Sequence, residues 1–170
     1  DLIVVGTRGW NGFSKLIFGS VADKVMNQAA CPVRLGRSAA GKGAPNLLIA
    51  YDGSPYADAA VALVAKRSWP KGTRVAVLAV SEIQLRLGEI AAAITDDLGF
   101  GKKSSPWPWM SKRLATVAKR LEAAGLRVDT SLVIGEIRHT IIRNAKLLKS
   151  DAIFMGSHGR TGFRRVMLGS

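Results

Sequence analysis

Strand-sized apolar runs alternate with stretches of helical periodicity along this chain, and this alternation constrains its fold more than any other feature. The expected strands are residues 1–6, 31–35, 46–51, 73–81, 127–135 and 151–156. The expected helices are residues 20–29, 55–68, 107–125 and 136–150. Runs rich in Val, Ile and Leu that are separated by helices are typical of a parallel sheet covered on both faces. The sequence therefore predicts an α/β protein with a doubly wound parallel sheet.

Several expected helices carry local signals at their ends. Ser54 or Asp52 is expected to cap the helix that follows the strand 46–51. Gly125 is expected to end the helix 107–125. We expect Glu136 in the first turn of the last helix and Lys149 in its last turn, where their charges suit the helix dipole. Asp52 and Gly156 each follow an expected strand directly, so we expect them to lie near one crevice at the carboxyl ends of the strands, where parallel sheets bind ligands.

A glycine-rich stretch occurs twice, at the two ends of the chain. When residues 1–20 are aligned with residues 151–170, eight of the twenty positions are identical, among them four glycines and a final serine. Both copies follow a strand-sized run and share the spacing G-x2-G-x9-G-S. Glycine lets the backbone approach a ligand closely, and the N–H groups at a helix N-terminus bind anions. One such loop would be interpreted as a turn, but its duplication favours an anion-binding motif.

The motif and three shorter stretches resemble one known family. With "DGS" at 52–54, "VLAV" at 77–80 and "ACPVRL" at 30–35, the chain resembles the universal stress protein family in its nucleotide-binding branch. The resemblance implies a Rossmann-like fold of the adenine-nucleotide alpha hydrolase type. It also implies a cytoplasmic, ATP-binding stress-response protein, with Mg²⁺ carried by the nucleotide, that acts by binding rather than by fast catalysis. Slow ATP hydrolysis is left open.

By position in the motif, the resemblance also implies which residues contact the nucleotide. Asp52 is expected on the ribose or adenine side, and Ala50 and Val80 are expected to line the base pocket. The ribose and phosphates would be wrapped by Met155, Gly156, His158 and Gly159, and the phosphate end would be held by Gly169 and Ser170. In the first copy the matching positions are Gly6, Arg8, Gly9, Gly19, Ser20 and Val21.

The resemblance divides the chain into two domains of unequal completeness. Residues 1–35 resemble the end of one domain, residues 36–45 form a linker, and residues 46–170 resemble a second domain without its last helix and strand. The chain is thus expected to be an excerpt of a tandem protein, and a homo-oligomer or a tandem pseudo-dimer is the expected assembly.

These domain limits lead to an expectation about strand pairing. We expect the strand 151–156, rather than its equivalent 1–6, to pair with the strand 46–51. Residues 31–35 would then cover the open edge of that sheet, and residues 1–6 would be displaced outward or paired with another chain.

Composition leaves a second class of function open. The formal net charge is +13, which would suit nucleic acid, an anionic membrane, a polyphosphate ligand or an ordinary basic solvated surface. Of these, a nucleotide is favoured over nucleic acid as the partner, and no membrane association is expected. An adenylating enzyme of similar fold is a further alternative, but residues 51–58 lack the His-rich signature that it would need. The sequence contains neither a metal-ligand cluster nor a set of nucleophile, base and orienting group.

The aromatic stretch 107–110 is expected to cover a loop or a partner surface, with base stacking as the alternative. His139 is expected to be exposed.

Overall fold

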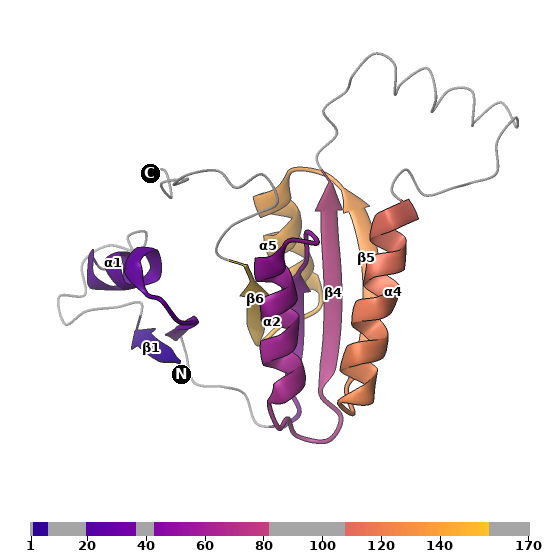
Figure 1. Ribbon diagram of the computed structural model, residues 1–170, viewed down its shortest axis with the longest axis horizontal. Coiled ribbons are helices and arrows are strands. Elements are labelled where there is room, and N and C mark those ends of the chain that lie inside the picture. The colour runs from indigo at the N-terminus through magenta and orange to yellow at the C-terminus, as the bar shows by residue number, and fades with distance from the viewer. Residues whose placement is uncertain (1, 7–19, 37–42, 82–107, 157–170) are drawn as a thin grey trace, which may run out of the picture. The chain divides into compact units, whose positions relative to one another are not determined.

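A computed structural model describes residues 2–6, 20–36, 43–81 and 108–156, apart from the side chain of Ser20 (Figure 1). The helices and strands in these ranges are β1 (Ile3–Gly6), α1 (Ser20–Gln28), β2 (Val33–Gly36), β3 (Asn46–Ala50), α2 (Pro55–Lys66), β4 (Arg74–Ser81), α4 (Pro108–Ala123), β5 (Arg127–Ile134), α5 (Ile137–Leu147) and β6 (Ala152–Met155). Each expected strand and helix is present, with ends shifted by a few residues. The chain falls into two compact units, Asp1–Gly41 and Lys42–Ser170.

The larger unit is built on a four-stranded parallel sheet with the strand order β5-β4-β3-β6. Its strands run side by side in Figure 1. From β3 the chain moves outward to β4 and β5, and it then returns to the other side of β3 with β6. The strand order therefore reverses between β3 and β6, and their carboxyl ends flank the position where such sheets bind ligands.

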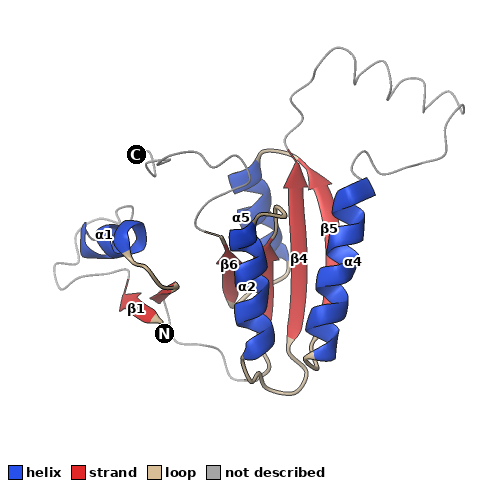
Figure 2. Ribbon diagram, viewed as in Figure 1, coloured by secondary structure: helices blue, strands red, loops and turns tan. Residues whose placement is uncertain are grey.

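Helices cover both faces of this sheet, as the apolar runs predict. On one face, Leu47, Ile49 and Val77 of the sheet pack with Val61 of α2 and Leu121 of α4 in the main hydrophobic core. On the other face, Leu48, Leu78 and Ile141 of α5 form a smaller cluster. Figure 2 shows α2 and α4 in front of the sheet and α5 behind it. Each fully buried aliphatic side chain contributes about 1.5–3 kcal/mol by leaving water, so these two layers fix the sheet.

The helix ends confirm one local signal and correct two others. Gly125 follows the end of α4 with a φ of +81°, a conformation that favours glycine. Glu136 is not in the first turn of α5 but caps it, because its carboxylate accepts from the N–H groups of Arg138 and His139. Lys149 lies beyond the helix rather than in its last turn. It adopts a φ of +48° there, and Ser150 N–H donates to Ala145 O at 2.8 Å.

The smaller unit corrects the expectation for residues 31–35. The strand β2 pairs with β1 in a two-stranded parallel sheet, with Ile3 opposite Val33 and Gly6 opposite Gly36. The helix α1 lies between these two strands in the chain and provides the crossover that a parallel pair of strands needs. The strand β6, by contrast, pairs with β3 as expected, with Ala50 opposite Met155.

Candidate functional site

The turn between β3 and α2 holds Asp52 in a defined orientation. Asp52 Oδ1 accepts a hydrogen bond from Ser54 N–H at 2.9 Å, which closes a small side-chain turn. Gly53 between them has a φ of +78°. Ser54 Oγ accepts from Ala57 N–H at 3.1 Å, so Ser54, rather than Asp52, caps α2. Pro55 at the first helical position needs no hydrogen-bond partner for its nitrogen. The sequence Asp-Gly-Ser-Pro thus fixes the start of α2 directly after the sheet.

Three of the residues predicted to contact a nucleotide share one face of the sheet near its carboxyl edge. Ala50 is opposite Met155 on β6 and opposite Leu78 on β4, and residues paired in a parallel sheet lie on the same face. Val80 lies two residues beyond Leu78 and packs with Ala50 around the same small cluster. Met155 is 57% exposed. The structure therefore places an apolar patch next to the Asp52 turn, made of Ala50, Val80 and Met155 on one face of the sheet.

Gly156 lies at the same edge of the sheet, against the first turn of α2. A Cβ atom added to Gly156 would lie 2.8 Å from Tyr56 Cβ, 3.0 Å from Tyr56 C and 3.1 Å from Ala57 N. The structure thus confirms that Gly156 and the turn at Asp52 are neighbours. It adds a reason for glycine that the sequence did not give: the backbone of α2 leaves no room for a side chain.

The rest of the predicted phosphate loop, namely His158, Gly159, Gly169 and Ser170, lies outside the described residues. In the first copy, Arg8, Gly9 and Gly19 also lie outside them. Gly6 ends β1, Ser20 begins α1, and Val21 is exposed on that helix. These three residues belong to the smaller unit, and their assignment to a nucleotide site stays a prediction.

The helix α4 contributes contacts to the Asp52 turn that sequence reasoning missed. Arg113 Nη1 donates a hydrogen bond to the carbonyl oxygen of Gly53. The ring of Trp109, one turn earlier on the helix, comes within 3.3 Å of the position that a Cβ atom on Gly53 would take. Trp109 thus covers a loop, as expected for this aromatic stretch. Arg113 lies in a strongly basic chain, so no local signal singles it out.

A buried tyrosine lies next to the same turn. The Tyr51 hydroxyl donates to Asp58 Oδ1 at 2.7 Å. Burial and the adjacent Asp58 carboxylate raise the pKa of Tyr51 to about 12, and the guanidinium of Arg113 offsets part of the rise. A groove of about 410 Å³ runs beside this tyrosine between α2 and α4. The described residues that line it are Tyr51, Asp58, Val61, Arg113, Thr116, Val117 and Arg120.

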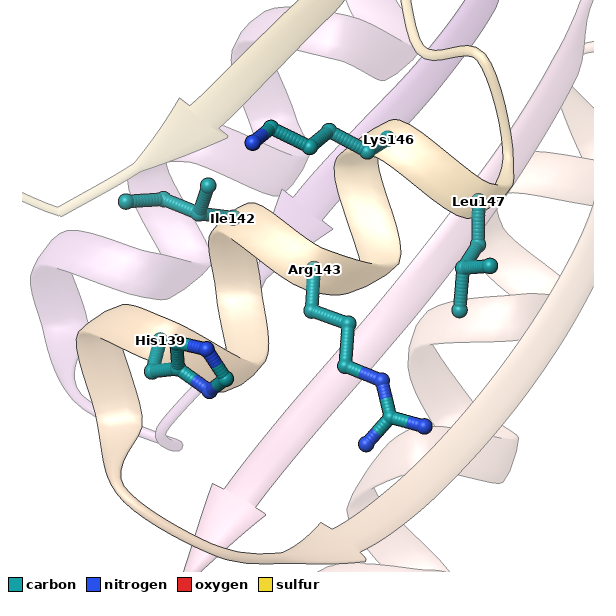
Figure 3. Close-up of a pocket in the computed structure, with 5 residues that line it drawn as sticks. All are labelled: His139, Ile142, Arg143, Lys146 and Leu147. Carbon is teal, nitrogen blue, oxygen red and sulfur yellow. The ribbon is translucent and has the colours of Figure 1, made fainter.

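A second hollow, of about 330 Å³, lies along the outer face of α5. Its lining among the described residues is His139, Ile142, Arg143, Lys146 and Leu147 (Figure 3). His139 is exposed on this face, as expected from the sequence. None of the described residues that are predicted to contact a nucleotide lines this hollow, and we assign it no role.

The described part of the chain contains neither a metal-ligand cluster nor a membrane-spanning helix. Within residues 2–6, 20–36, 43–81 and 108–156, no three His, Cys, Asp or Glu side chains are grouped so that they could hold a metal ion. In the same ranges, no helix is long and apolar enough to cross a membrane.

Comparison with known sequences shows the family. The sequence profile of the Universal stress protein family matches residues 1–35 and 44–170, so this chain belongs to that family. Universal stress protein Slr1230 of Synechocystis sp. is 31% identical over 68 residues, which are 40% of this chain and 24% of that protein. Universal stress protein MJ0577 of Methanocaldococcus jannaschii is 34% identical over 58 residues, which are 34% of this chain and 36% of that protein. The matched regions therefore span about a quarter to a third of these relatives.

Two solved structures have the same fold. The structure of MJ0577 superposes with a TM-score of 0.59 at 24% identity and covers 74% of this chain and 83% of that one. A universal stress protein from Archaeoglobus fulgidus superposes with a TM-score of 0.61 at 23% identity, covering 98% of this chain and 52% of that one. The predicted α/β fold with its parallel sheet, of the adenine-nucleotide alpha hydrolase type, is thereby confirmed.

Proposed function

We propose that this universal stress protein binds an adenine nucleotide, ATP foremost, at the carboxyl ends of β3 and β6. One observation supports the proposal most directly. The Asp52 turn and Gly156 lie next to each other at the point where the strand order of the sheet reverses. The second copy of the glycine motif begins at Gly156. A polar turn on one strand and a glycine-rich loop on its neighbour are the two parts that such a ligand needs.

The chemistry of the available side chains suits each part of the ligand. Ala50, Val80 and Met155 offer apolar surface to a base, and the carboxylate of Asp52 can accept hydrogen bonds from ribose hydroxyls. The motif residues His158, Gly159, Gly169 and Ser170 would supply backbone N–H groups and a hydroxyl to the phosphates. Mg²⁺ would arrive with the nucleotide rather than in a site of the protein.

We also propose that the chain represents two domains of a tandem protein. The family profile matches residues 1–35 and residues 44–170 as separate stretches, which supports a boundary in the linker 36–45. Residues 1–35 would then contribute the first motif copy, and residues 46–170 would contribute the second. A tandem pseudo-dimer or a homo-oligomer would bring two such domains together.

The substitution Gly159→Val tests the proposed site. A β-branched side chain would fill the space that the phosphate needs and resists positive φ, at a cost of about 1–3 kcal/mol. We expect the purified protein to bind ATP and the variant to lose this binding, as measured by isothermal titration calorimetry. Circular dichroism serves as the control for an intact fold. Unchanged ATP affinity in a folded variant would contradict the assignment.

Nucleic-acid binding is the second candidate, because the net charge of +13 favours it. Binding that depends on phosphate contacts along a nucleic acid weakens steeply as salt rises, with a slope set by the number of phosphates neutralised. A titration with single-stranded DNA at several salt concentrations separates this candidate from a nucleotide site. We expect ATP to compete only for the nucleotide site.

A further inference from the structure

The turn that carries Asp52 connects β3 and α2, and side chains of a third element, α4, also hold it in place. Arg113 lies 60 residues further along the chain, and its guanidinium donates to the carbonyl of Gly53. A Cβ atom added to Gly53 would lie 3.1 Å from Arg113 Nη1 and 3.3 Å from Trp109 Cζ3. The turn is therefore enclosed by two side chains of α4, one that donates a hydrogen bond and one that covers it.

We propose that Arg113 is a positioning residue for the nucleotide site, a role that rests on the function proposed above. The Asp52 carboxylate is bonded to Ser54 N–H, so its direction follows the backbone of the turn. Gly53 lies between them, and the backbone of glycine has more conformational freedom than that of any other residue. The hydrogen bond from Arg113 fixes the carbonyl of this one residue. Arg113 thus orients the carboxylate without contacting the ligand.

A second contact anchors the turn on its other side. Tyr51 directly precedes Asp52 and is buried, and its hydroxyl is bonded to Asp58 of α2. With Tyr51 fixed by α2 and Gly53 fixed by α4, Asp52 is the residue between two anchored neighbours. Each anchor includes one charged group, the guanidinium of Arg113 in one hydrogen bond and the carboxylate of Asp58 in the other. Such hydrogen bonds are stronger than those between neutral groups, so loss of the Arg113 anchor should have a measurable effect.

The groove between α2 and α4 offers a matched control. Arg120 lines the same groove two turns further along α4, away from the Asp52 turn. The variants Arg113→Met and Arg120→Met remove the same charge from the same helix face. Only the first removes the hydrogen bond to Gly53. Arg113→Lys keeps the charge and one donor on a more flexible side chain.

Two measurements on the whole chain test the proposal. The first is ATP affinity by isothermal titration calorimetry. The second is hydrogen exchange of the Ser54 amide by NMR, with the core amides of Leu48 and Val77 as a reference for global stability. For Arg113→Met we expect a loss of affinity of roughly tenfold, the size of one charge-assisted hydrogen bond. Ser54 should exchange faster while the two core amides keep their protection. Arg120→Met should match the wild type in both measurements, and Arg113→Lys should fall between.

Each failure has a distinct meaning. Unchanged Ser54 exchange in Arg113→Met would overturn the positioning role, whatever the protein binds. An equal loss of affinity in Arg120→Met would also overturn it, because charge alone would then account for the effect. If the wild type binds no ATP but Ser54 exchange still responds to Arg113→Met, the proposed function fails while the anchoring of the turn by Arg113 stands.

Discussion

At the residue scale, the hydroxyl of Tyr51 is the clearest case of a side chain whose chemistry is set by its surroundings. It is buried at the end of β3 and donates to a carboxylate, so its deprotonated form would face both a loss of hydration and a like charge. Both effects favour the neutral phenol, which is why the pKa of Tyr51 rises from 10.0 to about 12.

This pKa predicts how stability responds to alkaline pH. A group whose pKa is higher in the folded state stabilises the fold fully below its unfolded pKa, and this contribution is lost as pH rises through the folded pKa. For Tyr51 the window runs from pH 10.0 to about 12. We expect a tyrosinate absorbance step near the upper limit that disappears in Tyr51→Phe. The free energy of unfolding should also fall less steeply across this window in that variant.

Tyr56→Phe is the matched control, because Tyr56 is half-exposed on the first turn of α2. It should leave the absorbance step near the upper limit in place. A step that persists in Tyr51→Phe would show that a different group produces it.

At the scale of elements, the packing of β6 against the start of α2 connects the two halves of the candidate site. The strand β6 is held on β3 by the sheet ladder, and the Asp151 carboxylate at its start accepts from Asn46 N–H at 2.8 Å. At its other end, Gly156 lies against the backbone of α2. The loop after β6 therefore leaves the sheet at a point fixed by α2.

Gly156→Ala tests this contact. The added methyl group would meet backbone atoms at Tyr56 and Ala57 that side-chain rotation cannot move, so β6 and α2 must separate. We expect the free energy of unfolding to fall by about 1–3 kcal/mol, as for other overpacked sites. Urea denaturation measures the change.

Gly36→Ala provides the control at the end of another strand. A Cβ atom on Gly36 would come no closer than 4.0 Å to Val5 O, so this variant should unfold like the wild type. Equal stability of Gly156→Ala and the wild type would show that α2 yields at this contact at little cost.

At the scale of the whole molecule, positive charge is the dominant electrostatic property. The net charge is +13, and Arg160, Arg164 and Arg165 lie within the second glycine motif. Charges clustered near a phosphate site attract a triphosphate more than a monophosphate, and salt screens the difference.

We therefore expect ATP to bind more tightly than AMP, with a gap that widens as salt is lowered. Isothermal titration calorimetry at two salt concentrations measures both affinities. The substitution Arg74→Met provides a control, because Arg74 begins β4, far along that strand from the carboxyl edge. Equal affinities for ATP and AMP at low ionic strength would contradict this expectation.

The sequence by itself determined the elements, the sheet type and the start of α2. Alternating apolar runs predict buried parallel strands because both faces of each strand must be apolar. The order Asp-Gly-Ser-Pro predicts a capped helix because its hydrogen bonds join residues two or three positions apart. These features depend only on neighbours in the chain, so they can be found without knowing the fold.

Three features were decided only by the tertiary structure. They are the pairing of β2 with β1, the need for glycine at position 156, and the hydrogen bond that holds the carbonyl of Gly53. The equivalent strands β1 and β6 look alike locally, and their pairing depends on the crossover that each helix makes. The contact between Arg113 and Gly53 joins residues that are 60 positions apart. It exists because packing of Leu114 and Val117 into the core sets the rotation of α4 about its axis, which turns Arg113 toward the Asp52 turn. Such contacts depend on how whole elements pack, and no local pattern encodes that.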